Sequence, residues 1–333
     1  MIEEIRLGTI GSGPIVRSIL DNVSRVEGIR LAAVYSRSGE RGKALADDYG
    51  AAKVYTEMEA FLKDEEINFV YVATPNLLHY EQTKNALLSE KNVICEKPFC
   101  TQAKQAAELT ALAREKGLFL IDAVPTAFLP NLEILKAQLP KIGKIKLVMG
   151  NYSQYSSRYD QLLEGKVPNI FNPEYAGGCL MDINFYNVYL TVALFGMPKE
   201  TAYYPNFHTN ARGGRIDTSG VALLVYEDFV SQLSGAKDTW GVNFFQIEGE
   251  SGYIYIKGGS NMLSEIKVVT KKTEECLNEQ SNPDRWFYEV QNLTRQILTG
   301  DYESAFKGLD TMQQVVAVLE NTRKKAGILF PGD

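Results

Sequence analysis

Apolar and polar positions follow two different patterns along the chain, and the first pattern runs from residue 5 to about residue 122. Short apolar runs there alternate with segments in which apolar residues recur at the spacing of one helix face. Strands that alternate with helices in this way predict βαβ units and a parallel, doubly wound sheet. The runs that we expect to be strands are residues 5–10, 29–36, 68–75, 92–98 and 118–122.

The pattern changes near residue 123. Segments such as VALLVYEDF and YIYIK indicate longer, partly alternating strands with few helices between them. This predicts a mostly antiparallel sheet that buries one face and leaves the other to water or a partner. Two helices close the chain. One begins at Asn282 as the cap, with Pro283 in the first helical position, and the other carries apolar residues from Leu309 to Leu319 on one face.

A chain of 333 residues is long for a single hydrophobic core, so two domains are expected. The fold class that we predict is α/β. Residues 1–123 would form the doubly wound parallel sheet. Residues 124–333 would form an α+β domain with a large, mostly antiparallel open sheet.

Charge and composition exclude several classes of protein. The formal net charge is −6, and no Lys/Arg-rich stripe is present. Such a chain is poorly suited to bind nucleic acid or an anionic membrane. The N-terminus has no basic n-region, and no stretch reaches the ~18 consecutive apolar residues of a membrane span. We therefore expect a cytoplasmic protein with no nucleic-acid or membrane partner.

Cysteine and histidine are sparse. The four cysteines form no CxxC pair, so reduced thiols are the simpler interpretation. The two histidines, His79 and His208, cannot make an HxxxH or HExxH spacing. We expect no metal site.

A glycine-rich turn, GSGPIV, follows the first expected strand and precedes a helix. In a dinucleotide fold this turn approaches the pyrophosphate, and the helix N-terminus offers free N–H groups to the anion. Val16 stands where the fingerprint has its third glycine, and a purely structural turn is the alternative. The residues expected to bind the cofactor here are Gly11, Ser12, Gly13, Pro14 and Ile15.

The end of the second strand bears on which cofactor is bound. NAD sites usually place Asp or Glu there to bind the ribose 2′-hydroxyl. This chain has no acidic residue between Glu27 and Glu40. Ser36, Arg37 and Arg41 could instead bind a 2′-phosphate, which favours NADP over NAD. Alternatively, these are solvated loop residues.

Two further groups of residues suggest proton transfer. Lys97, between Glu96 and Pro98, follows a strand at the sheet edge where ligands bind. A double glycine precedes a predicted helix on which Asp182 and Tyr186, four residues apart, would share a face. The structural alternatives are a solvated turn for Lys97, a helix N-terminal carboxylate for Asp182 and a core aromatic for Tyr186.

Four motifs in order resemble the Gfo/Idh/MocA oxidoreductases over essentially the whole chain. They are the glycine turn, TPNxxH at residues 74–79, EKP at 96–98, and Gly177, Gly178, Asp182 and Tyr186. The resemblance implies an N-terminal Rossmann domain that binds NAD(P) and a C-terminal domain for substrate binding and oligomerisation. It implies hydride transfer to or from sugars, polyols or related cyclic alcohols. Further cofactor contacts that it implies are Thr74, Pro75, Asn76, His79, Glu96 and Lys97.

The resemblance also implies catalytic roles. Lys97 matches the family's catalytic lysine, and Asp182 matches the carboxylate that orients substrate and lysine. Tyr186 stands where many members have histidine, which resembles the branch containing dihydrodiol dehydrogenase, NADP-linked xylose dehydrogenase and glucose–fructose oxidoreductase. Tyr186 is then a general acid. His79 is either a positioning residue near the nicotinamide or a hydrogen-bonded loop histidine.

The substrate domain offers a few polar and aromatic candidates. Tyr155, Arg158 and Asn172 suit recognition of a sugar-like ring, although surface decoration explains them equally well. We expect a small sugar- or polyol-like substrate and a homodimer or homotetramer. The alternative function is a non-catalytic NAD(P)-binding regulatory protein of the same architecture.

Overall fold

The computed structural model describes residues 2–333, which separate into two compact units. The first unit comprises the residues up to Cys100, Lys104–Phe128 and Asp284–Met312. The second comprises Thr101–Ala103, Leu129–Pro283 and Gln313–Asp333. Both units are therefore discontinuous in sequence. The division predicted at residues 123 and 124 stays a prediction, since compactness alone does not define a domain.

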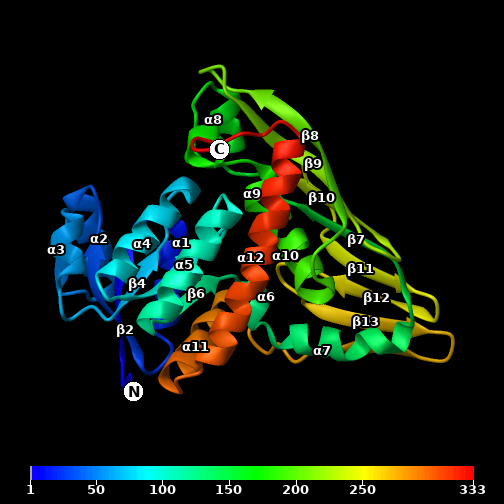
Figure 1. Cartoon of the computed structure of the whole chain (residues 1–333), viewed down its shortest axis with the longest axis horizontal. Helices are drawn as coiled ribbons and strands as arrows, with labels where there is room; N and C mark the ends of the chain where they lie inside the picture. Colours follow the sequence, from blue (N-terminus) through cyan, green and yellow to red (C-terminus); the bar gives the residue numbers. More distant parts are fainter. Residues whose placement is uncertain (1) are drawn as a thin grey trace. The chain divides into compact units, whose positions relative to one another are not determined.

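The first unit contains a parallel sheet of six strands in the order β3-β2-β1-β4-β5-β6 (Figure 1). The order reverses between β1 and β4, which is the point where doubly wound sheets bind their ligands. The predicted fold class is confirmed, although the sequence pattern missed the short strand β3. The strands are β1 (Ile5–Ile10), β2 (Ile29–Tyr35), β3 (Lys53–Tyr55), β4 (Phe69–Val72), β5 (Asn92–Glu96) and β6 (Leu120–Ala123).

Helices follow the strands of this sheet, as right-handed βαβ crossovers require. A helix from much later in the chain, α11, packs against α1 and α6 and adds Val290, Leu293 and Ile297 to the same core as Leu7 and Val16. The helices are α1 (Pro14–Val23), α2 (Gly39–Tyr49), α3 (Met58–Leu62), η1 (Asn76–Leu78), α4 (His79–Leu88), α5 (Ala103–Lys116), α6 (Pro125–Phe128) and α11 (Arg285–Leu298).

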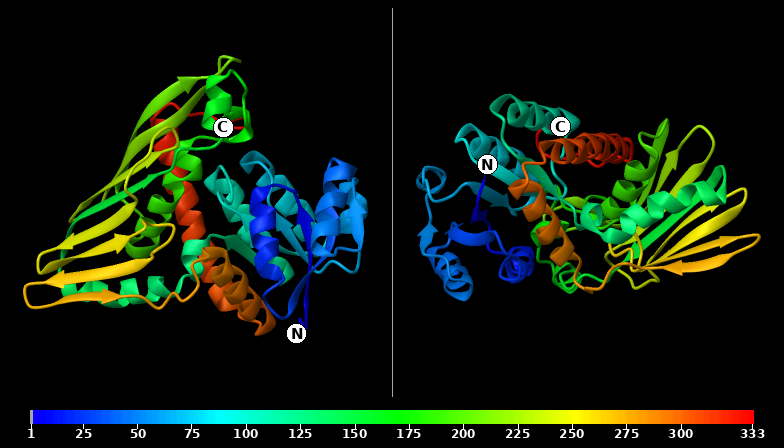
Figure 2. Two further views of the ribbon diagram at one scale, coloured as in Figure 1. Left: turned by 180° about the vertical axis from the view of Figure 1, so that it is seen from behind. Right: turned by 90° about the horizontal axis from the view of Figure 1, so that it is seen from below.

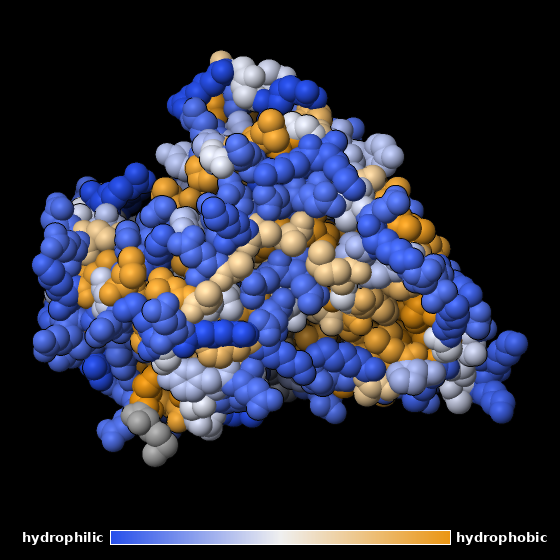
Figure 3. All heavy atoms as spheres, in the orientation of Figure 1, coloured by the Kyte–Doolittle hydropathy of each residue, from blue (hydrophilic) through white to orange (hydrophobic). Residues whose placement is uncertain are grey.

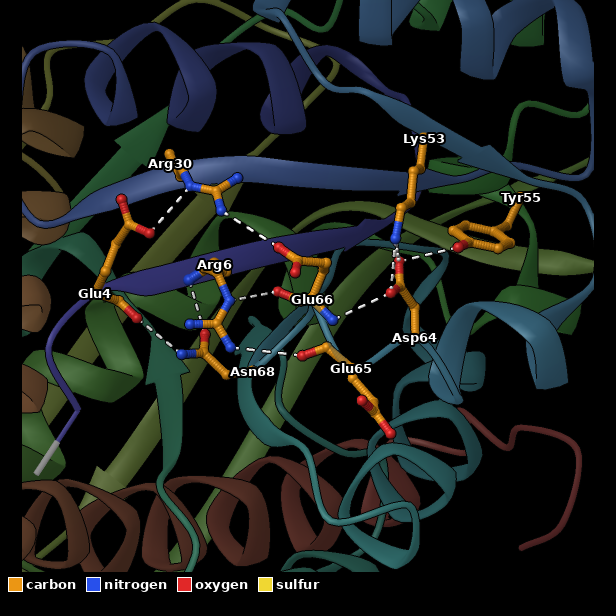
Figure 4. A network of polar contacts seen from close by, with 9 residues as sticks. All are labelled: Glu4, Arg6, Arg30, Lys53, Tyr55, Asp64, Glu65, Glu66 and Asn68. Carbon is orange, nitrogen blue, oxygen red and sulfur yellow. Dashed lines mark hydrogen bonds and ion pairs between the residues drawn. The ribbon is translucent and has the colours of Figure 1, made fainter.

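A polar network ties together the amino ends of four strands in the first unit (Figure 4). Arg6 donates to the carbonyl oxygen of Glu66 at 2.7 Å, and the Asn68 side chain bonds both the amide of Arg6 and the carbonyl of Glu4. Asp64 accepts from Lys53 and from the Tyr55 hydroxyl at 2.9 Å each. In a parallel sheet the amino ends lie opposite the ligand-binding edge. We therefore assign this network to stability.

The second unit is built on a sheet of eight strands in the order β14-β13-β12-β11-β7-β10-β9-β8. The neighbouring strands are antiparallel except β7 and β10, which run parallel, so the predicted mostly antiparallel sheet is confirmed. The sequence pattern missed β8, β13 and β14. The strands are β7 (Ile145–Ser153), β8 (Glu200–Thr209), β9 (Arg215–Val225), β10 (Val230–Ala236), β11 (Phe244–Gly249), β12 (Gly252–Lys257), β13 (Glu265–Thr270) and β14 (Glu274–Leu277).

One face of this sheet is buried and contacts α10, which packs on β7 and β10 (Figure 2). Val148, Leu233 and Ile247 point to that face and are fully buried. Their neighbours along the strands point the other way and are half-buried or exposed, as alternation requires. The helices of this unit are α7 (Pro130–Gln138), η2 (Leu139–Ile142), α8 (Tyr159–Leu163), η3 (Asn169–Phe171), η4 (Pro173–Tyr175), α9 (Cys179–Asp182), α10 (Asn184–Phe195) and α12 (Tyr302–Lys325), whose first residues belong to the first unit.

The cap predicted for the first closing helix is wrong. The N-cap of α11 is Asp284, whose carboxylate accepts from the amide of Trp286 at 3.0 Å. Asn282 and Pro283 therefore lie before the helix. An aspartate two residues further on satisfies the free N–H groups in the same way as asparagine would.

No single helix within residues 2–333 is long and apolar enough to cross a membrane. A bent pair, Pro173–Asp182 with Asn184–Phe195, meets the length and composition test only when its two parts are taken together. Figure 3 shows hydrophilic side chains over much of one face of the molecule, with apolar patches between them.

Candidate active site

The glycine-rich turn between β1 and α1 fits a pyrophosphate. Gly11 has φ +120°, and a Cβ there would lie 2.5 Å from the carbonyl oxygen of Ala73, so a side chain is excluded. A Cβ on Gly13 would meet nothing within 4 Å, which leaves its surroundings open to a ligand. Ser12 and Ile15 are half-buried, and Pro14 is exposed.

The N-terminus of α1 is free to bind an anion. Gly13 is the N-cap and supplies no side-chain hydrogen bond, and Pro14 occupies the first turn. The first N–H groups of a helix have no partner within the helix, and the helix dipole makes this end positive. Val16, which replaces the third glycine of the fingerprint, is fully buried in the core. The turn and the helix end therefore fit a dinucleotide phosphate.

The end of β2 places two exposed guanidinium groups near a buried hydroxyl. Ser36 is 6% exposed and accepts from the amide of Ser38 at 3.3 Å. Arg37 and Arg41 are exposed, and neither forms an ion pair with a carboxylate in the described part of the chain. Ser38 caps α2 by accepting from the amide of Arg41. A phosphate would find both guanidinium groups available.

His79 connects the loops that follow β4 and β5. Its Nδ1 lies 2.9 Å from the carbonyl oxygen of Pro98, and its Nε2 lies 2.8 Å from that of Thr74. The side chain is buried, and this burial, the largest influence, lowers the pKa of His79. Both ring nitrogens thus contact backbone carbonyls, so His79 holds the segment Thr74-Pro75-Asn76 beside the segment that carries Lys97. The Thr74 hydroxyl also donates to Gln82 at 2.6 Å.

Lys97 is half-buried at the end of β5, and its peptide bond to Pro98 is cis. The preceding residue, Glu96, is buried. Its carboxylate accepts from the Tyr71 hydroxyl at 2.6 Å and from the amide of Lys97 at 3.1 Å. Burial raises the pKa of Glu96, and burial beside Glu96 raises that of Tyr71.

The first unit buries two more carboxyl groups, those of Glu289 and Asp122. Neither side-chain oxygen of Glu289, on α11, has a hydrogen-bond partner, and Oδ2 of Asp122, at the end of β6, has none either. Burial raises the pKa of Asp122 to about 7, and burial together with the charge of Glu96 raises the pKa of Glu289 well above its usual value. Burial is the largest influence on each of these acids and favours their neutral forms.

The double glycine of the second unit is required by close packing. A Cβ on Gly177 would lie 2.6 Å from the carbonyl oxygen of Ile170, and one on Gly178 only 2.0 Å from Oδ1 of Asp217. Asp217 is buried and accepts from the amide of Leu180 at 2.7 Å and from the Tyr203 hydroxyl at 2.8 Å. Burial raises the pKa of Asp217 to about 6.

Asp182 and Tyr186 do not share one regular helix, which corrects the prediction. Asp182 is the last residue of α9, and Tyr186 lies on the first turn of α10. The chain bends by 61° between the two helical segments, at Ile183. The i, i+4 rule therefore does not apply across the break. Tyr186 is buried, and its ring meets that of Tyr152 edge-on with centroids 5.9 Å apart.

Sequence reasoning missed Lys237, which follows β10. Its ammonium group forms an ion pair and hydrogen bond with Oδ2 of Asp182. The Lys237 side chain is 6% exposed and that of Asp182 is 18% exposed. A lone lysine after a strand carries no motif, so the sequence offered no signal for it.

The three predicted substrate contacts have different surroundings. Tyr155 donates to Asp160 at 2.6 Å and stacks on the ring of Trp240, which is 78% exposed. Arg158 is exposed. Asn172 is buried and caps η4 by accepting from the amide of Glu174, which accounts for it without a substrate. Trp240 is a second residue that the sequence analysis missed.

Comparison with known proteins matches both units. A family model for the NAD-binding Rossmann fold of the GFO/IDH/MocA oxidoreductases matches residues 5–122, and one for the family's C-terminal domain matches residues 138–255. The oxidoreductase YgjR of Escherichia coli is 34% identical over 329 residues, covering 99% of this chain and 98% of YgjR. The scyllo-inositol 2-dehydrogenase (NADP(+)) IolU of Bacillus subtilis is 33% identical over 332 residues, covering 99% of each chain.

A solved structure shares the fold. The 3-ketoreductase KijD10 from Actinomadura kijaniata, in complex with NADP and TDP-benzene, aligns with a TM-score of 0.84 at 21% identity, covering 97% of this chain and 98% of that one. The matched family models and full-length relatives above 30% identity agree with the residue motifs. The chain belongs to the Gfo/Idh/MocA family of NAD(P)-dependent oxidoreductases that act on sugars, polyols and related compounds.

Proposed function

We propose that this protein is an NADP-dependent dehydrogenase or reductase of a small polyol, sugar or related cyclic alcohol. The proposal rests mainly on the end of β2. Arg37 and Arg41 can bind a phosphate there because they are exposed and form no ion pair with a carboxylate within residues 2–333. An NAD site would have an acidic residue here. The relative IolU, named as an NADP(+)-linked inositol dehydrogenase, supports the same cofactor and substrate class.

The residues of the first unit fit the cofactor. The open space at Gly13 and the uncapped α1 suit the pyrophosphate, while Ser36, Arg37 and Arg41 suit a 2′-phosphate. Bound NADP would supply the nicotinamide carbon that accepts or donates the hydride. The remaining contacts that we assign to it are Gly11, Ser12, Pro14, Ile15, Thr74, Pro75, Asn76, Glu96 and Lys97, with His79 holding two of these segments together.

The chain's own residues would then bind the substrate and move its hydroxyl proton. Asp182 would accept a hydrogen bond from a substrate hydroxyl and so fix the orientation of the ring. Tyr186 and Lys97 would be the general acid and base at the reacting oxygen, where a correctly placed group contributes about 10²- to 10⁴-fold in rate. Tyr155 and Arg158 would contact the rest of the substrate.

Two measurements test this function. Fluorescence titration with NADPH and NADH should show tight binding of NADPH alone. Turnover should follow on a panel of cyclic polyols, aldoses and dihydrodiols. Replacing Lys97 by Met should abolish turnover and leave NADPH binding nearly intact. Normal kcat in that variant would refute the role of Lys97, and dinucleotide binding without turnover on the whole panel would favour a regulatory protein.

We further propose that the protein is a homodimer or homotetramer that associates through the outer face of its large sheet. Leu147, Met149, Leu223 and Tyr255 lie on that face and are only half-buried within one chain. A second copy would bury these apolar side chains. Light scattering after gel filtration should give two or four times the mass of one chain, and a monomer would contradict the proposal.

A further inference from the structure

We propose that Lys237 is a positioning residue of the active site. Its buried ammonium group would hold the carboxylate of Asp182 in one place and keep it ionised, so that Asp182 can accept a hydroxyl group of a polyol. The inference deepens the proposed function and rests on it. It adds a lysine from the strand region after β10 to the residues that the family motifs identify.

The surroundings of Lys237 fix the position of its side chain. The backbone amide of Lys237 donates to the carbonyl oxygen of Thr218 at 2.8 Å, and its own carbonyl accepts from the amide of Ser156 at 2.9 Å. The ammonium group lies over the ring of Phe171, 5.6 Å from its centroid. A cation over an aromatic face is attracted to it. Backbone bonds and ring together leave the long side chain little freedom.

Asp182 is the more accessible partner of the pair. Its side chain is 18% exposed, against 6% for that of Lys237. The carboxylate is therefore the group of the pair that a ligand can contact more readily. A neutral polyol offers hydroxyl donors, and an ionised carboxylate is a stronger acceptor for them than a protonated one.

Other carboxylates surround the same lysine. Asp217 on β9 and Asp238, which follows Lys237 in the chain, both help to raise the pKa values of Cys179 and Tyr203. The charge of Lys237 in turn stabilises the ionised form of Asp217. Asp217 is held by Leu180 and Tyr203, and Asp238 accepts from the Ser219 hydroxyl at 3.1 Å. Without the positive charge of Lys237, the negative charges of these carboxylates would be compensated less. Asp182 would then take up a proton more readily.

A gain in stability does not by itself explain the ion pair between Lys237 and Asp182. Removing two charges from water costs several kcal/mol per ion, and apolar residues of similar volume are often as stable or more so. A buried pair next to a proposed substrate-binding carboxylate is better explained by the charge and position that it gives that carboxylate.

The test compares Lys237→Met, Lys237→Arg, Asp182→Asn and the double variant Asp182→Asn/Lys237→Met with the wild type. Lys257→Met is the matched control, because Lys257 ends β12 in the same unit and is exposed. For each protein, kcat and KM are measured across pH on the best substrate of the panel with NADPH or NADP. NADPH binding and thermal unfolding are recorded in parallel.

We expect Lys237→Met to lower kcat/KM on the order of 100-fold, as misplacement of a reacting group does. The acidic limb of its pH profile should move to higher pH, because the carboxylate then protonates more readily. Lys237→Arg should retain most of the activity, and the acidic limb of its pH profile should lie where it does in the wild type. In the Asp182→Asn background, Lys237→Met should have almost no further effect, since Lys237 acts through Asp182. NADPH binding and the Lys257→Met control should match the wild type.

Three results would overturn the inference while the proposed function stands: an unmoved acidic limb in Lys237→Met, a full further loss in the double variant, or Lys237→Arg as inactive as Lys237→Met. The double variant decides the matter even if Lys237→Met unfolds, because it leaves no unpaired buried charge. If the wild type turns over nothing on the panel, the proposed function fails and this inference fails with it.

Discussion

The first unit exposes guanidinium groups at the end of β2 and buries carboxyl oxygens that accept no hydrogen bond, whereas the second unit buries an ammonium group directly against a carboxylate. Arg37 and Arg41 are exposed, and Glu289 and Asp122 are buried with unpartnered oxygens. Lys237 is buried against Asp182, whose side chain is 18% exposed, and the ring of Trp240 is exposed in the same unit.

This difference matches two kinds of ligand. Exposed, unpaired guanidinium groups suit a phosphate, which brings its own charge. A fixed carboxylate suits a neutral polyhydroxylated ring, which brings hydroxyl donors, and an exposed aromatic ring suits its apolar face. The first unit therefore offers positive charge to an anionic ligand, and the second offers a negatively charged acceptor to a ligand with hydroxyl donors.

The largest expected effect concerns the buried acids of the first unit. The pKa of Asp122 is raised from 3.8 to about 7 by burial. Between these two values the folded chain binds a proton that the unfolded chain has lost, so stability falls as pH rises, and it levels off above pH 7. Asp122→Asn lacks this titration, so its stability relative to the wild type should rise by about 4 kcal/mol from pH 4 to pH 8, at 1.36 kcal/mol per pKa unit. Urea unfolding at both pH values measures this, and equal pH slopes would contradict it.

The next effect compares the two kinds of buried charge directly. Lys237→Met leaves Asp182 without its cation and should lower the free energy of unfolding by roughly 3 kcal/mol at pH 7. Burial raises the pKa of Glu289 and so favours its neutral form, which Gln resembles in shape, so Glu289→Gln should destabilise the protein far less. Guanidinium-induced unfolding of both variants tests the contrast. A large loss in Glu289→Gln would mean that Glu289 is ionised and has a partner.

Substitutions at the end of β2 should change the affinity for the cofactor. Arg37→Ala and Arg41→Ala each remove a charged donor and should weaken NADPH binding by about 1.5–3 kcal/mol, roughly 10- to 150-fold. NADH lacks the 2′-phosphate, so its affinity should stay unchanged or improve. Parallel titrations with both nucleotides measure the change. If the affinity for both fell equally, these residues would contact a part that the two cofactors share.

The smallest effect concerns the exposed aromatic pair. Trp240→Ala removes the ring that stacks on Tyr155 and should raise KM about 5- to 10-fold, corresponding to about 1 kcal/mol of stacking, with kcat nearly unchanged. Steady-state kinetics on a cyclic polyol measures it. Trp286→Ala is not a suitable control, because Trp286 packs on the core of the first unit. Tyr204→Phe is better, since Tyr204 is 66% exposed on β8.

The regular parts of the fold could be predicted because their signals are local. Gly11 and Gly13 between strand and helix indicate the turn that we assign to the cofactor, and the apolar runs identify five of six parallel strands. The short β3 was missed since three residues carry too little pattern. The break at Ile183 was missed because NFYNVYL continues the apolar pattern of a helix.

The missing site residues could not be predicted, since tertiary structure brings them into place. Lys237 and Asp182 are 55 residues apart in sequence and meet only through the packing of α9 near β10. Nothing in either local segment indicates the other. The same holds for Glu289, which reaches the neighbourhood of Glu96 from α11.

The packing of α11 also determines when the nucleotide-binding unit can fold. A ribosome delivers β1 through β6 early, but Val290, Leu293 and Ile297, which cover α1 and β1, emerge only after the whole large sheet has been synthesised. Until then the nascent Rossmann sheet presents an uncovered apolar surface, the kind that binds chaperones or aggregates. The first unit can therefore complete this core only after residue 297 has been synthesised.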